Sequence, residues 1–219
     1  SSIPTREQAL RMGRALEPFD LTWIEDPVAD EDERDHAVVA RELNTPVCFG
    51  EKVYGPEGIR RIIDAQAADV LMADLQRSGG VTGWTRIAAM AAAARLPLSS
   101  HILPETNLHL VASAPTGFWL EYMDWGNGLF AEPMRLDKGM ARIPAKPGLG
   151  LEWNEPAIAA ASSSRLARMV MSMRGQDLQG RGTMLTWPPI ATCLEGACHE
   201  RRPRFAADAP HPRRRRHRR

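Results

Sequence analysis

The composition is that of an ordinary globular protein, since 43% of the 219 residues are apolar and 25% are charged. No run of about 18 apolar residues occurs, which excludes a typical membrane-spanning helix, and the first residues lack the basic segment and apolar core of a secretory signal. Three cysteines are too few for a disulfide framework. We therefore expect a cytoplasmic protein without a membrane partner.

The net charge of +1 conceals two segments of opposite sign. Residues 1–164 carry 15 Lys+Arg and 23 Asp+Glu, a net charge of −8, whereas residues 165–219 carry 13 Arg and 4 Asp+Glu, a net charge of +9. Hydrophobic periodicity also disappears beyond Ser162, where Arg, Pro and His cluster. The sequence therefore predicts a folded domain over residues 1–160 and a disordered Arg/Pro-rich tail over residues 161–219.

Short apolar runs alternate with helical patterns along the predicted domain. Thr5 is a plausible N-cap of the first helix. Apolar spacing and turn residues predict helices over about 5–16, 36–43, 56–67, 82–95, 107–114 and 155–161. Continuous apolar runs predict buried strands over 21–25, 47–51, 70–74, 97–101 and 118–122.

This alternation predicts an α/β fold with parallel strands. Successive strand ends lie 20 to 27 residues apart, enough for one helix and two short loops. Right-handed crossovers of this length close into a TIM-type (β/α) barrel, here a partial one. A doubly wound open sheet explains the alternation equally well, but it concentrates functional residues at one crevice. A titratable residue at every strand end favours the barrel.

The five predicted strands end in Glu25, Glu51, Asp74, His101 and Glu121. The ends of parallel strands meet at one edge of a sheet, so the first two carboxylates are expected to share a pocket. Hard oxygen ligands of this kind suit Mg²⁺. The alternative is that each acid caps a helix or forms an ion pair with Lys52 or Arg77.

The later strand ends suggest proton transfer. An Asp74 carboxylate hydrogen-bonded to one nitrogen of His101 would leave the other nitrogen as a general base. Glu121 could donate a hydrogen bond to substrate if apolar neighbours such as Trp119 and Trp125 raise its pKa. The alternatives are a structural histidine and an ordinary salt bridge.

The arginine-rich end of the chain suggests nonspecific affinity for polyanions. Arginines occupy positions 213–216, 218 and 219, and such runs bind nucleic acid or anionic lipid through charge alone. No aromatic or groove-reading motif accompanies them, so no specific nucleic-acid partner is expected.

The strand ends also carry longer motifs. These are Trp23-Ile24-Glu25-Asp26-Pro27, Gly50-Glu51, Asp74 followed by Arg77-Ser78-Gly79-Gly80-Val81-Thr82-Gly83-Trp84, Ser99-Ser100-His101, and Trp119-Leu120-Glu121. In this order and spacing, over about residues 5–158, they resemble the C-terminal barrel of the enolase superfamily. The closest resemblance is to the mandelate racemase group.

The resemblance implies an enzyme that uses Mg²⁺ to remove the proton alpha to a carboxylate. Glu25 and Glu51 would be metal ligands, Asp74 and His101 the base, and Glu121 a hydrogen-bond donor to the carboxylate of the substrate. The substrate would be a small-molecule carboxylate, either a 2-hydroxy acid that is racemised or a sugar acid that is dehydrated. Dehydration is slightly favoured, and a homo-oligomer is compatible with it. Muconate lactonisation is disfavoured, because that group uses a lysine where His101 stands.

The sequence also departs from this family. The family has a further aspartate ligand, a Lys-x-Lys pair on earlier strands and an N-terminal capping domain. No Lys-x-Lys occurs here, and residues 1–19 contain no aspartate. We therefore expect a truncated enzyme that is inactive or nearly so by itself. The alternative is a non-catalytic remnant or binding module whose basic tail binds polyanions.

Overall fold

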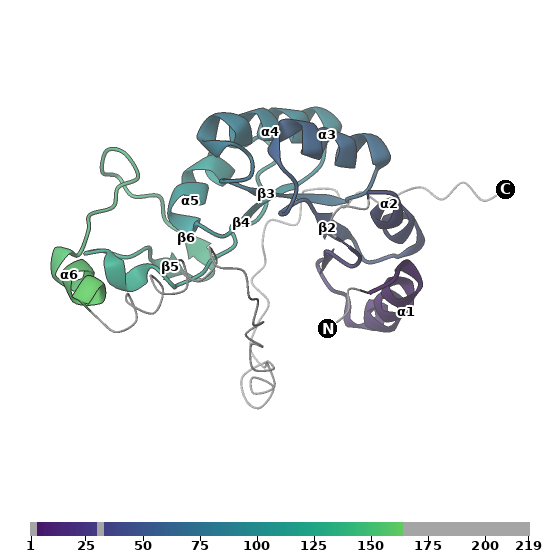
Figure 1. The fold of residues 1–219 in the computed structure, drawn as a ribbon, viewed down its shortest axis with the longest axis horizontal. Helices are drawn as coiled ribbons and strands as arrows, with labels where there is room; N and C mark the ends of the chain where they lie inside the picture. Colours follow the sequence, from purple (N-terminus) through teal and green to yellow (C-terminus); the bar gives the residue numbers. More distant parts are fainter. Residues whose placement is uncertain (1–3, 30–32, 164–219) are drawn as a thin grey trace, which may run out of the picture. The chain divides into compact units, whose positions relative to one another are not determined.

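The structure is a computed structural model that describes residues 4–29 and 33–163 (Figure 1). It divides into two compact units, and each is described by itself. Among the described residues, the first comprises 4–29, 33–134 and Ile143–Asn154, and the second comprises Arg135–Arg142 and Glu155–Ser163. Of the predicted disordered tail over 161–219, the first three residues are helical, and residues 164–219 lie outside the described residues, so the prediction for them stays a prediction.

The first unit contains a parallel sheet with the strand order β1-β2-β3-β4. Asp74 is paired with His101 in the register of the last two strands. The strands are β1 (Ile24–Glu25), β2 (Val47–Phe49), β3 (Val70–Asp74) and β4 (Leu98–His101). The parallel βα alternation predicted from the sequence is therefore present.

The strand predicted over 47–51 ends earlier, at Phe49, and two other predicted strands differ more from the structure, for identifiable reasons. Of the strand predicted over 21–25, only Ile24–Glu25 forms. Pro46 accepts a hydrogen bond from the Ile24 N–H, but it has no N–H of its own, so it cannot donate to a carbonyl earlier in the predicted strand. The strand predicted over 118–122 does not form as a regular strand. That segment follows β4 through backbone bonds at Phe118 and Trp119, but the Glu121 N–H then donates to the Ser100 side chain, which ends the ladder.

Among the described residues of this unit, five α-helices precede, connect or follow these strands. Thr5 caps the first helix as predicted, through a reciprocal pair of hydrogen bonds with Gln8. The last begins at Pro104, before the predicted start at 107, because proline is well suited to the first helical turn. The helices are α1 (Arg6–Leu16), α2 (Glu33–Glu42), α3 (Gly55–Ala65), α4 (Gly80–Ala94) and α5 (Pro104–Ser113), with short 3₁₀ turns η1 (Glu17–Phe19) and η2 (Asn127–Leu129).

Turn geometry places α3 and α4 against the sheet. Each ends at a residue with a left-handed backbone, Gln66 (φ 54°) and Arg95 (φ 59°). The Gly79-Gly80 turn leads from β3 into α4, and both glycines have positive φ. At Gly83 an added Cβ would lie 1.7 Å from the Ser78 carbonyl oxygen, so α4 approaches the preceding turn too closely for any side chain.

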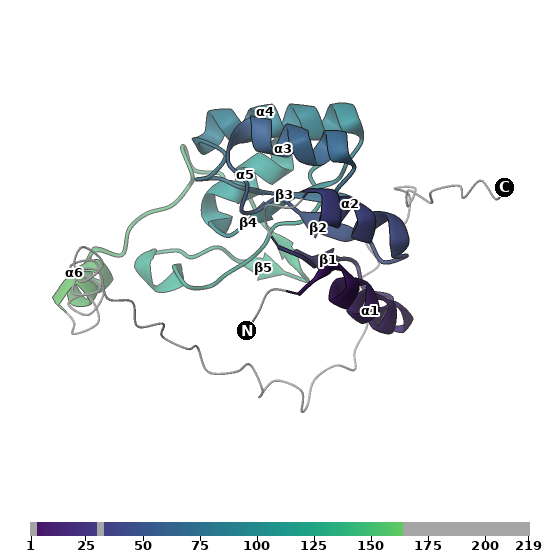
Figure 2. The same cartoon turned by 45° about the vertical axis from the view of Figure 1, so that its right-hand side comes forward.

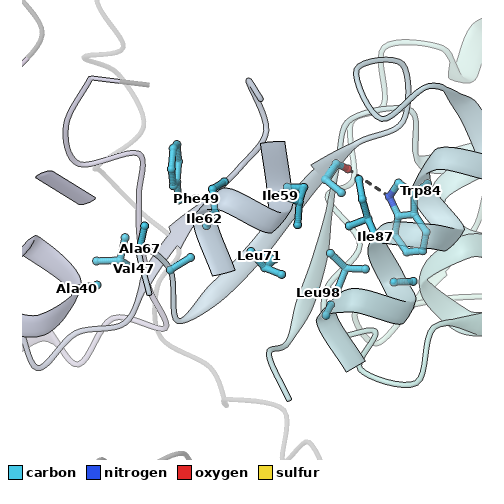
Figure 3. Close-up of a cluster of buried hydrophobic side chains, with 14 of the residues drawn as sticks. Ala40, Val47, Phe49, Ile59, Ile62, Ala67, Leu71, Trp84, Ile87 and Leu98 are labelled. Carbon is cyan, nitrogen blue, oxygen red and sulfur yellow. Dashed lines mark hydrogen bonds between the residues drawn. The ribbon is translucent and has the colours of Figure 1, made fainter. Parts of the chain in front are cut away.

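Helices α3 and α4 lie side by side over one face of the sheet (Figures 1 and 2). Alternate strand residues meet them in the hydrophobic core, where the Trp84 indole also donates to the Ala73 carbonyl oxygen at 3.4 Å (Figure 3). This cluster includes Val47, Phe49, Leu71, Leu98, Ile59, Ile62 and Ile87. A smaller cluster of Cys48, Val70 and Met72, with Trp23 against it, contains the alternate strand positions.

The second unit contains a short antiparallel hairpin and a helix. The hairpin is formed by β5 (Leu136–Asp137) and β6 (Met140–Ala141), and the helix is α6 (Glu155–Ser163). The helix predicted over 155–161 is thus present and runs slightly further. Within residues 4–29 and 33–163, no helix has the length and hydropathy that a membrane span requires.

Candidate active site at the strand ends

All five titratable residues predicted from the strand ends lie at the carboxyl end of the sheet or of the segment beside it. Glu25, Asp74 and His101 are the last residues of β1, β3 and β4. Glu51 lies just beyond β2, and Glu121 follows the extended segment beside β4. Parallel strands present their carboxyl ends at one edge, which explains why residues so far apart in sequence come together.

Asp74 and His101 form a hydrogen-bonded pair. The Nδ1 atom of His101 lies 2.8 Å from Oδ2 of Asp74, whose side chain is only 3% exposed. The other carboxylate oxygen, Oδ1, accepts the backbone N–H of Arg77 at 2.7 Å. Because both Asp74 oxygens are engaged, the carboxylate holds the imidazole ring in one orientation.

The second nitrogen of the same ring faces another carboxylate. Nε2 of His101 lies 3.1 Å from Oε2 of Glu51, and the two side chains are 16% and 13% exposed. A neutral imidazole has one N–H, so both contacts are hydrogen bonds only when the ring is protonated. His101 therefore lies between a fixed carboxylate and one at the position predicted for a metal ligand.

Glu51 also has cationic neighbours, as the alternative interpretation expected. Its Oε1 atom lies 3.6 Å from Nζ of Lys52, which in turn lies 3.2 Å from Oδ2 of Asp26. The Arg77 guanidinium donates to the backbone carbonyl of Glu51, at 2.8 Å, and not to its carboxylate. The ion pair with Lys52 is thus present together with the contact to His101.

Glu25 lies in the negative potential of this cluster. The residue as a whole is exposed, but its carboxylate is partly desolvated, and this desolvation is the main cause of its raised pKa. The charges of Glu51, Asp26 and Glu121 raise the pKa further, although a 3.2 Å hydrogen bond from the Trp23 indole lowers it. Burial and the same acids raise the pKa of the Cys48 thiol. Among the described residues, no group of three His, Cys, Asp or Glu side chains is arranged to hold a metal ion.

Glu121 is positioned by the loop that follows His101. Its Oε2 atom accepts the backbone N–H of Ile102 at 2.6 Å, and its own N–H donates to the Ser100 hydroxyl at 3.0 Å. These bonds attach Glu121 to the residues on both sides of His101, Ser100 in β4 and Ile102 just beyond it. Its predicted role as a hydrogen-bond donor stays a prediction.

Sequence reasoning missed the structural roles of Arg77 and Ser100. Arg77 connects Asp74 to the backbone of Glu51, and Ser100 connects β4 to Glu121. A signal existed for Arg77, because an aspartate at a strand end commonly accepts a backbone N–H a few residues later. Nothing in the pattern around Ser100 distinguishes it from the buried Ser99.

The comparisons with known proteins agree with this arrangement. Residues 2–157 match the family model described as enolase C-terminal domain-like. L-talarate/galactarate dehydratase of Salmonella typhimurium is 38% identical over 152 residues, which are 69% of this chain and 38% of that protein.

Two solved structures extend this similarity to the fold. An enolase from Bradyrhizobium complexed with magnesium and mandelic acid is 41% identical, with a TM-score of 0.67, over 71% of this chain and 43% of that one. L-Talarate dehydratase from Polaromonas sp. JS666, complexed with Mg and L-glucarate, is 37% identical, with a TM-score of 0.68, over 71% and 42%.

The chain spans about two fifths of the length of the relatives it matches. The match covers the parallel sheet and its helices, so the predicted partial (β/α) barrel is confirmed. The predicted resemblance to the mandelate racemase group of the enolase superfamily is confirmed as well. The chain therefore belongs to the enolase C-terminal domain-like family.

Proposed function

We propose that this chain supplies the general base and part of the metal site of a Mg²⁺-dependent acid-sugar dehydratase. The observation that carries the proposal is the series of contacts Asp74–His101–Glu51, in which the base lies directly beside a metal-ligand candidate. The similarity to talarate/galactarate dehydratases supports a sugar acid as substrate. A cytoplasmic location remains part of the proposal.

The donor set at the strand ends fits a magnesium ion. Glu25 and Glu51 offer only oxygen ligands, and their mutual repulsion contributes to the raised pKa of Glu25, so a cation between them would be favourable. The bound ion would supply positive charge to the oxygens of the substrate where negative charge develops.

In the proposed reaction His101 moves a proton. The bond between hydrogen and the carbon alpha to the substrate carboxylate breaks, the proton passes to Nε2, and the electron pair shifts toward the carboxylate. Asp74 keeps Nδ1 protonated, so that Nε2 is the nitrogen available as acceptor. His101 then returns the proton to the departing 3-hydroxyl, which leaves as water.

Glu121 would bind the carboxylate of the substrate. Its fixed position, held by the Ile102 N–H, places a hydrogen-bonding group near the same strand ends. We expect little turnover by this chain alone, because it contributes two glutamates to the metal site and contains no Lys-x-Lys. The tests below therefore include a readout besides turnover.

The metal half of the proposal is tested by titrating the full chain with Mg²⁺ in a calorimeter. Replacement Glu51→Gln removes one ligand charge and is expected to weaken binding at least about tenfold, since even loss of a residue that only supports a ligand typically costs about 10–100-fold in metal affinity. Glu152→Gln is the matched control, since Glu152 is an exposed glutamate paired with Lys146. Equal Mg²⁺ affinities for the parent chain and Glu51→Gln would contradict the metal assignment.

The base half is tested by exchange of the alpha proton of galactarate in D₂O at high protein concentration. Exchange needs only proton removal, so it is more sensitive than product formation. His101→Asn should lower any exchange by about 10²–10⁴-fold, the usual contribution of a general base. Exchange that survives unchanged in His101→Asn would exclude His101 as the base.

A further inference from the structure

The two residues after His101 have a strained backbone. Ile102 and Leu103 both have positive φ, 39° and 47°, although neither is glycine. Left-handed geometry is particularly unfavourable for a β-branched residue such as Ile102. Such a conformation persists only when the surrounding structure enforces it.

One buried side chain enforces this conformation. Asn107, in the first turn of α5, is completely buried, and its Nδ2 donates to the carbonyl of His101 at 3.1 Å and to that of Ile102 at 2.6 Å. Its backbone N–H also donates to the carbonyl of Leu103 at 3.0 Å. Asn107 thus donates to three consecutive carbonyl groups, those of His101 and of the two strained residues.

The strained segment lies between the proposed base, His101, and the hydrogen bond that holds Glu121. His101 precedes it and is paired with Asp74 through Nδ1, while the Ile102 N–H donates to the Glu121 carboxylate at 2.6 Å. The peptide between His101 and Ile102 cannot turn without breaking both the bond from its N–H to Glu121 and the bond from Asn107 to its carbonyl. The orientation of both site residues therefore depends on one peptide.

We propose that Asn107 is a positioning residue. By holding the left-handed backbone of Ile102 and Leu103, it fixes the orientations of both His101 and Glu121. The catalytic meaning of this role rests on the proposed function, but the geometric role does not. Leucine at 107 has no donor for the two carbonyls, and aspartate would place a charged acceptor against them. Asparagine supplies both N–H groups from one short side chain.

The experiment follows the 219-residue chain by nuclear magnetic resonance, without substrate or metal. In Asn107→Ala, amide hydrogen exchange at Ile102 should be at least tenfold faster than in the parent chain, with exchange at Met72 in β3 unchanged. The ring nitrogens of His101 should also lose the signature of a single tautomer. That ring signature separates positioning from a purely structural role.

Asn127→Ala is the matched control, because the Asn127 side-chain amide also donates a hydrogen bond, to the Tyr122 hydroxyl at 2.8 Å, elsewhere in the same unit. The control should leave Ile102 and His101 unchanged. Unchanged exchange at Ile102 in Asn107→Ala would overturn the proposal. Equal acceleration at Ile102 and Met72, or an unchanged ring signature, would do the same.

A second variant keeps the test decisive if Asn107→Ala does not fold. Ile102→Gly removes the backbone strain at position 102, because glycine adopts positive φ freely, so the hydrogen bonds of Asn107 are no longer needed to offset it. In that background, Asn107→Ala should reduce the folding equilibrium constant several-fold less than it does alone, and the double variant should fold. An unfolded double variant, or an equal reduction in both backgrounds, would overturn the proposal.

Discussion

The centre and the edge of the sheet contribute differently to the site. Strand β3 is buried at all five positions and pairs with β4 at four successive residues, ending at Asp74 and His101. Strand β1 has two residues, is paired only with β2 among the described strands, and ends at the exposed Glu25. The proposed base therefore lies on the most extensively paired strands of the sheet, whereas one proposed metal ligand, Glu25, lies on its shortest strand.

The largest expected difference concerns core packing. Leu71→Ala in β3 removes a fully buried side chain and should lower the free energy of unfolding by about 2–5 kcal/mol. Ile24→Ala in β1 removes a partly buried side chain and should cost clearly less. Urea unfolding of both variants measures the difference. Equal losses would show that the edge strand is as firmly held as the centre.

An intermediate effect is expected where the two halves of the site are joined. Arg77→Met keeps the backbone N–H that binds Asp74 but removes the guanidinium bond to the Glu51 carbonyl. A hydrogen bond from a charged group typically contributes about 1.5–3 kcal/mol. This bond is only partly buried, so its loss should lower the free energy of unfolding by at most that amount. Unfolding measurements test stability, and Mg²⁺ calorimetry should show weaker binding. Unchanged values for both would mean that Arg77 does not position Glu51.

The smallest expected effect is a change in pH dependence at the edge. The pKa of Glu25 is raised in the folded chain, so folded Glu25 binds more protons than unfolded Glu25 as the pH rises above the ordinary pKa of about 4.3. Stability therefore decreases with rising pH through this window because of Glu25. Glu25→Gln should lack that decrease while keeping an acceptor for Trp23.

Stability curves from about pH 3.5 to 7 check this prediction. The parent chain and Glu25→Gln should be similarly stable at the acidic end, and the variant should become the more stable of the two toward neutral pH. Glu152→Gln, at an exposed site, should follow the parent chain throughout. Parallel curves for the parent and Glu25→Gln would contradict a raised pKa at this position.

The sequence predicted the centre of the fold better than its edges. The runs ending at Asp74 and His101 are apolar, continuous and bounded by turns, and they form strands close to the predicted ranges. The ends of the sheet depend on partners that no local pattern shows. The lost donor at Pro46 shortens β1, and the Ser100 hydroxyl interrupts pairing before Glu121.

The site was predictable as a set of residues but not as a network. Alternating strands and helices bring strand ends together by topology alone, so the identities of Glu25, Glu51, Asp74, His101 and Glu121 could be proposed. The contact between Glu51 and His101 depends on side-chain conformations, and the support from Asn107 depends on left-handed residues before α5. Spacing in sequence contains neither kind of information.

The left-handed residues that end α3 and α4 are positions where a substitution could stabilise the fold. Gln66 and Arg95 are exposed and adopt a backbone geometry that glycine adopts freely. Gln66→Gly and Arg95→Gly should each recover up to about 1 kcal/mol of strain. Both positions precede the amino ends of strands, opposite the site, so the chain can be made more heat-tolerant without altering its chemistry.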